Sequence, residues 1–131
     1  SVASRGLGDV YKRQVLINND GLIMTTYTNT SYMAKSVGTS ASTLTTVASG
    51  YTTTVTSLVV ANTTTSPITC DVYVTRSAVD YYLVKTATVP VGGSLEVMQG
   101  NRIVLIASDA LKVVSSAASS ADVIVSVLLA N

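Results

Sequence analysis

The chain has 131 residues and a formal net charge of +1, and only 11% of its residues are charged. That fraction lies well below the roughly 25% of ordinary soluble domains, and Thr, Ser, Val and Ala make up the difference. A net charge this small creates no positive electrostatic field that would attract nucleic acid or an anionic membrane surface. The longest apolar runs are also far shorter than the ~20 residues of a membrane helix. We therefore expect one domain of ordinary size, with neither nucleic acid nor a membrane as its partner.

The first residues differ in character from the rest of the chain. Residues 4–14 hold three of the eight basic residues and show no hydrophobic periodicity. Residues 9–14 are what GAT GTG TAT AAG AGA CAG encodes, and the whole of 4–14 resembles a sequencing adapter translated in frame. Processing scars do not belong to a fold. Residues 1–32 are therefore expected to be a non-native leader, disordered or loosely packed, and residues 33–131 a single domain starting at Met33, with Met24 as the alternative start.

From Met33 onward, short runs rich in β-branched residues alternate with turn signals. Ile68–Arg76 shows the clearest pattern, because apolar and polar residues alternate along it as they do in a half-buried antiparallel strand. A polar hinge at 63–67 separates it from the long run before it, and these two runs are expected to form the first long strand pair. Eight strands are predicted in all, at residues 44–47, 51–62, 68–76, 81–87, 95–98, 103–107, 111–115 and 123–129.

The later runs carry two further expectations. Residues 103–107 are nearly all apolar, which favours a central strand, and residues 99–101 before them are typical of a tight hairpin connection. A helix over 107–118 is the alternative, but the β-branched pair at 113–114 disfavours it. The strand spacing predicts an all-β fold, an antiparallel β-sandwich of jelly-roll type with about eight strands.

The inward-facing apolar positions of these strands form the predicted core. Cys70 is in phase with Ile68 and Val72, so it is expected to be a small core residue rather than a nucleophile. Each fully buried aliphatic side chain contributes roughly 1.5–3 kcal/mol. The predicted core consists of Leu58, Val60, Ile68, Cys70, Val72, Val74, Leu95, Val97, Ile103, Leu105, Leu111, Val113, Val125 and Val127.

No arrangement of residues points to catalysis or to metal binding. The chain has no His and one Cys, so the commonest general base and the usual thiolate and imidazole ligands are missing. The acids Asp71, Asp80, Asp109 and Asp122 lie singly near turns or on outward strand faces, as solvated turn residues do. We therefore expect no enzyme, no cofactor and no metal. Three or more carboxylates converging in one pocket would reverse this expectation.

Tyr73, Tyr81 and Tyr82 form the one aromatic cluster in the pattern. Tyr73 falls on the outward face of its strand, whereas Tyr81 and Tyr82 point to opposite faces, so only one of these two can enter the core. The remaining tyrosines are either ordinary strand residues or a flat amphipathic surface for a protein or glycan partner. A coplanar exposed pair beside a groove would favour a glycan, and an apolar patch or an open sheet edge would favour assembly.

The order of motifs carries a resemblance to a known family. After a Met-Ala-Lys start at Met33, the chain shows a long Thr-rich run at 50–63, then 81–87, 89–96 and an Asp-containing turn at 109–113. This order resembles small virion structural proteins of tailed bacteriophages, of the type recovered from marine metagenomes, over residues 33–131.

The resemblance implies a β-sandwich that acts without catalysis in head decoration or as a tail or neck component. Its partners would be further copies of itself and other virion proteins, in a virion assembled in the host cytoplasm. The alternative is a carbohydrate- or receptor-binding sandwich that uses the exposed tyrosines among Tyr73, Tyr81 and Tyr82.

Overall fold

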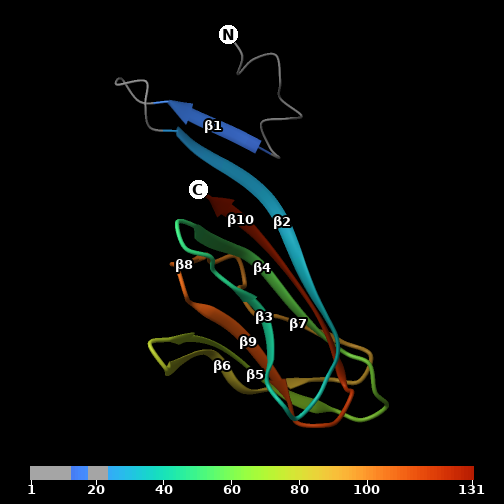
Figure 1. Cartoon of the computed structure of the whole chain (residues 1–131). Coiled ribbons are helices and arrows are strands. Elements are labelled where there is room, and N and C mark those ends of the chain that lie inside the picture. Colours follow the sequence, from blue (N-terminus) through green and yellow to red (C-terminus); the bar gives the residue numbers. More distant parts are fainter. Residues whose placement is uncertain (1–12, 18–23) are drawn as a thin grey trace.

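The computed structural model describes residues 13–17 and 24–131 (Figure 1). The regular structure of these residues is all strand, and every pairing is antiparallel. This part of the chain therefore holds no helix with the length and apolar character to cross a membrane. The predicted all-β antiparallel sandwich is confirmed.

The strands divide into two sheets. Sheet A runs in the order β1 (Arg13–Ile17), β2 (Met24–Val37), β10 (Ala121–Ala130), β4 (Thr52–Asn62) and β7 (Ser94–Glu96), and β8 (Ile103–Leu105) also pairs with β4. Sheet B runs in the order β3 (Ser42–Thr46), β9 (Ala110–Ser115), β5 (Ile68–Arg76) and β6 (Val79–Val89). In Figure 1, β2 and β10 reach beyond the shorter strands of sheet B.

The core lies between the sheets, on the faces that the alternating pattern selects. The predicted core residues are buried except for Leu95, Val97 and Ile103, which pack against the core near the edge of sheet A and are half-buried. Cys70 is a buried free thiol, as predicted. Burial, reinforced by the neighbouring charge of Asp71, raises the pKa of that thiol to about 11.

The segment around the polar hinge is not a strand pair, contrary to the prediction. β4 belongs to sheet A and β5 to sheet B, so the hinge carries the chain from one sheet to the other. Asn62 organises this crossing, since its Nδ2 donates hydrogen bonds to the carbonyls of Ser66 (2.8 Å) and Val89 (3.1 Å). Its Oδ1 accepts the backbone N–H of Thr64 at 2.8 Å. The amide thereby pairs backbone groups that leave the ladders here.

The apolar run at 103–107 is not a central strand, and residues 99–101 do not form a hairpin. β7 and β8 both pair with β4, β7 with its residues 59–61 and β8 with its residues 53–55. They are two pieces of one interrupted edge strand, and between them the Val97 N–H still donates to the carbonyl of Leu58 at 2.8 Å. The run of apolar residues thus lies at an edge of sheet A.

The predicted domain boundary at Met33 falls inside β2, which begins at Met24. Residues 27–34 of β2 pair with β10, and β1 pairs with residues 24–28. Residues 24–32 are therefore part of sheet A instead of a loosely packed leader. Most of the adapter-like stretch, residues 4–12, lies outside the described residues, and its origin stays a prediction.

Candidate functional site

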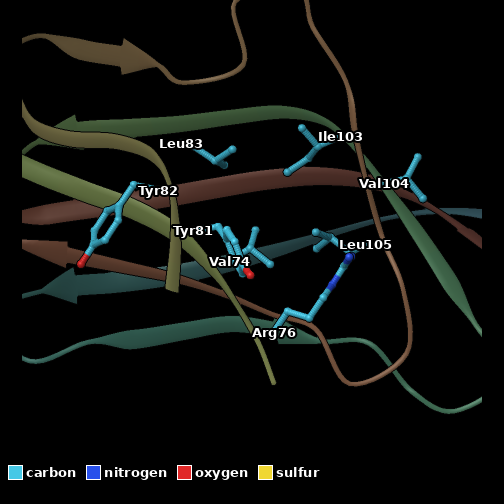
Figure 2. A pocket seen from close by; sticks show the side chains of 8 residues that line it. All are labelled: Val74, Arg76, Tyr81, Tyr82, Leu83, Ile103, Val104 and Leu105. Carbon is cyan, nitrogen blue, oxygen red and sulfur yellow. The ribbon is translucent and has the colours of Figure 1, made fainter. Parts of the chain in front are cut away.

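An apolar groove with a volume of about 270 Å³ lies where both sheets end on the same side of the sandwich. We call this the groove side, formed by β6 of sheet B and by β7 and β8 of sheet A. Leu83 and Tyr81 line the groove from β6, and Ile103 and Leu105 line it from β8 (Figure 2). Val74 on β5 completes the apolar lining, together with Val104 and Tyr82, and Arg76 lies at one end.

The register of sheet B explains why Tyr81 lines the groove. Tyr81 pairs with Val74, and residues directly opposite each other in a ladder share a face of the sheet. Val74 is buried in the core, so Tyr81 points to the same inner face. Tyr81 nevertheless stays exposed, because β6 is the last strand of sheet B among the described residues.

Exposed hydrophobic side chains gather on the groove side. Five of the eight large apolar side chains that are exposed in the described residues lie there, each between 44% and 58% accessible: Val79, Tyr81, Tyr82, Val104 and Ile106. Single exposed hydrophobic residues are ordinary, whereas a group of them beside an apolar groove is typical of an interaction surface. Of the remaining three, Met33 lies in β2, Ile124 in β10 and Val91 in the turn between β6 and β7.

A charged pair fixes one end of the groove. Arg76 donates from Nε to Asp109 Oδ1 (2.8 Å) and from NH2 to Asp109 Oδ2 (2.6 Å), a bidentate contact. The carboxylate, whose side chain is only 1% exposed, also accepts the N–H of Ile106 at 2.9 Å. The hydrogen bond from Arg76 holds the pKa of Asp109 below its usual value. The pair thereby ties the β5–β6 hairpin to the link between β8 and β9.

Asp109 corrects one prediction and supports part of it. Asp109 is a turn residue, as predicted, and its carboxylate accepts the N–H of Ile106 within that turn, but the residue is buried and not solvated. Its backbone also holds β3 in place, because the Asp109 carbonyl accepts the N–H of Val47 at 2.9 Å. Sequence reasoning missed Arg76 as its partner, since nothing in a local pattern links two residues 33 positions apart.

The three predicted tyrosines do not form one surface. Tyr73 lies on the outer face of sheet B as expected, but it is only 8% exposed because Tyr82 on the neighbouring strand covers it. Their ring centroids are 5.0 Å apart and the planes are inclined at 40°, so they form a tilted pair without a coplanar platform. Burial raises the pKa of Tyr73. Tyr82 remains exposed, with Lys85 Nζ 4.3 Å from its ring centroid, and Tyr81 lies in the groove.

The other predicted acids lie apart, and each has its own partner. Asp71 accepts the N–H of Thr86 at 2.6 Å, and Asp80 accepts the hydroxyl of Thr75 at 2.7 Å. Asp122 accepts the N–H of Ser36 and Lys35 Nζ, both at 2.9 Å. Over residues 13–17 and 24–131, no three His, Cys, Asp or Glu side chains gather in a way that could hold a metal ion.

Comparison with known proteins yields little. No protein-family model matches the chain, and no curated protein is similar to it in sequence. Among solved structures, a chain from Bacillus endospore appendages, described as a novel family of disulfide-linked pili, is 11% identical, with a TM-score of 0.44. The similarity covers 91% of this chain and 88% of that one.

Proposed function

We propose that this protein is a non-enzymatic structural protein that acts by assembling with further copies of itself. The observation that carries the proposal is the concentration of exposed hydrophobic side chains around the groove at the open edges of both sheets. Burying apolar surface is the main favourable term in protein association. Open edge strands also offer unpaired backbone groups to another chain.

The setting we propose is the virion of a tailed bacteriophage, in head decoration or in the tail or neck. The order of motifs over residues 33–131 supports it, and so does the low content of charged residues, which suits a packed assembly. The glycan-binding alternative has less support, because Tyr73 is covered and the ring planes of Tyr73 and Tyr82 are tilted. The proposal assigns no cofactor and no catalytic residue.

Sedimentation velocity of the whole chain over a range of concentrations tests the proposal. The unmodified chain is expected to form oligomers, and the double variant Val104→Thr/Ile106→Thr is expected to need a much higher concentration to do so. Both residues are exposed, so these changes should affect the stability of the fold by less than about 0.5 kcal/mol.

Ile124→Thr is the matched control. Ile124 has a similar exposed fraction, but it lies on β10, which has β2 on one side and β4 on the other and is therefore not an edge strand. This variant should assemble like the unmodified chain. A clean monomer of the unmodified chain at high concentration would overturn the proposal.

A further inference from the structure

We propose that β3 of one copy adds to β6 of the next, so that copies in the same orientation continue the sandwich edge to edge. The inference deepens the proposed assembly and rests on it. It names the part of the second copy that meets the groove side. We call that part the opposite side, formed by β3 and by the carboxyl-terminal half of β2, which lie next to each other.

The number of strands in sheet B determines the relative direction of its two edge strands. β3 and β6 are its two outermost strands among the described residues, and three antiparallel pairings separate them. β3 therefore runs antiparallel to β6 within one molecule. A second copy in the same orientation then presents its β3 antiparallel to the first copy's β6, which is the direction that an antiparallel ladder requires.

Sheet A has the same property. Three antiparallel pairings lead from β2 through β10 and β4 to β7, so β2 runs antiparallel to β7, and likewise to β8. β1 covers β2 only along residues 24–28, so residues 29–37 have no strand beyond them within the described chain. A copy in one orientation can therefore face both open edges of the groove side at once.

The chemistry of β3 fits this role. Edge strands are usually protected from pairing with other chains by Lys, Pro or inward-pointing charges. β3 reads Ser-Thr-Leu-Thr-Thr and contains none of these. Thr43 and Thr46 are exposed on it, whereas Leu44 is buried in the core. An uncharged strand of this kind adds backbone hydrogen bonds without repulsion.

The charges on β6 do not oppose such a strand. Asp80 accepts the Thr75 hydroxyl, and Lys85 lies over the ring of Tyr82 and 3.8 Å from Asp71 Oδ2. Both charges are thus engaged within their own sheet. The resulting contact joins two different surfaces, so repetition leads to a ring if the rotation between copies closes and to a helical filament if it does not.

Cysteine cross-linking between mixed variants tests the inference. Thr43 lies in the same cross-strand row as Lys112, Tyr73 and Tyr82, so Tyr82 marks the level at which a neighbour's Thr43 is expected. We would place single cysteines at Thr43 on β3 and, in separate variants, at Asp80 and Lys85 on either side of Tyr82. Cys70 is buried and its pKa is raised to about 11, so it stays silent.

The whole chain is used, with a bismaleimide that spans about 8 Å. Strands lie ~4.8 Å apart and rise ~3.3 Å per residue, so this reach tolerates a register shift of about two residues around each position. A cross-linked dimer is expected when Thr43→Cys is mixed with Asp80→Cys or with Lys85→Cys, and not when any variant is treated alone. Ile124→Cys mixed with Thr43→Cys is the matched control and should give only background.

The outcomes separate this inference from the proposed function. If the chain assembles but neither mixture cross-links, the pairing of β3 with β6 is wrong and assembly stands. If Thr43→Cys or a β6 variant cross-links with itself, the contact is two-fold and the inference is overturned. A monomeric chain would overturn both.

Discussion

The groove side and the opposite side of the sandwich both leave strands unpaired in the described residues, but they expose different chemistry. The groove side carries Tyr81, Val104 and Ile106 around an apolar groove. The opposite side carries the uncharged strand β3, and close to its end Tyr32 and Tyr51 line a second groove of about 270 Å³. One surface can bury apolar area and the other can supply a strand, so the two complement each other better than either complements itself.

The largest expected effect comes from the charged pair that closes the groove. Arg76→Ala leaves the carboxylate of Asp109 buried without its bidentate partner, and a buried charge that loses its partner strongly destabilises the fold, although the half-exposed side chain of Arg76 keeps the cost below that of a fully buried pair. Urea unfolding at neutral pH measures the loss. Lys35→Ala is the matched control on β2, because that lysine is exposed and its pair with Asp122 is worth no more than about 0.5 kcal/mol. Equal losses for the two variants would contradict the prediction.

The contribution of the Arg76–Asp109 pair to the stability of the fold depends on pH, and the direction of that dependence follows from the pKa of Asp109. Arg76 lowers the folded-state pKa of Asp109 below its unfolded value, so the stabilisation is fully present above that unfolded value and is lost as the pH falls through the folded-state pKa. The difference in unfolding free energy between the unmodified chain and Arg76→Ala should therefore shrink under strongly acidic conditions. Unfolding in urea at pH values of about 7 and about 3 tests this, on either side of the ordinary carboxyl pKa. A difference that stays constant would contradict it.

Tyr73→Ala is expected to cost roughly 3 kcal/mol, at the lower end of the range for removing a large buried ring. The residue is covered by Tyr82 and supports β6, the strand that borders the groove. Tyr81→Ala removes a ring of the same kind from an exposed position on β6, so it should lower the free energy of unfolding far less than Tyr73→Ala does. Thermal or urea unfolding of both variants checks the contrast, and similar losses would mean that Tyr73 is not held by its neighbours.

The turn between β5 and β6, beside the groove, offers a place where substitutions are expected to stabilise the fold. Ser77 and Ala78 form its two-residue turn with φ values of 53° and 63°, a left-handed conformation that Asn and Gly adopt more readily. Replacing them by Asn and Gly should stabilise the fold by about 1 kcal/mol, because side chains other than Gly are strained there. Ser119→Gly, at a φ of 48° in the loop before β10, is the control and should stabilise the fold without changing assembly. A loss of stability in the hairpin variant would contradict the prediction.

Alternation of residues, together with turn signals, was enough to predict eight of the ten strands in the described residues, β3 to β10, and most of the core. Ile68–Arg76 is β5 to the residue, because its period of two is unbroken and its turns are well marked. Alternation does not say which strands share a sheet, so β4 and β5 were expected to pair although the hinge separates them. β1 and β2 were missed for a different reason, since residues up to 32 were assigned to the leader because they precede Met33, and the predicted strands begin only at residue 44.

The groove itself shows where a local pattern misleads. Residues 103–107 are apolar throughout, and a continuous apolar run is typical of a strand buried on both faces. In the structure Leu105 is buried, whereas Val104 and Ile106 point outward at the edge of sheet A. Burial on both faces is missing within one chain, and a second copy can supply it. The bond between Arg76 and Asp109 is equally hidden from sequence, because only the fold brings their two turns together.

The smallest expected effects come from the exposed lysines, and they sharpen the contrast between the two sides. Lys85 on β6 lies over the ring of Tyr82, whereas the side chain of Lys35 on β2 is 83% exposed and forms an ion pair with Asp122. Lys85→Ala should cost about 0.5–1 kcal/mol and keep most of that cost in high salt, because its contact with the ring includes packing of the side-chain stem. Lys35→Ala should cost no more than about 0.5 kcal/mol, and salt should remove that cost by screening an exposed pair. Unfolding midpoints of both variants at low ionic strength and in about 1 M sodium chloride, where the Debye length is ~3 Å, distinguish the two. If Lys85→Ala also loses its effect in salt, then Lys85 contributes as a charge only, and the groove side has no advantage over the opposite side in holding its charged residues.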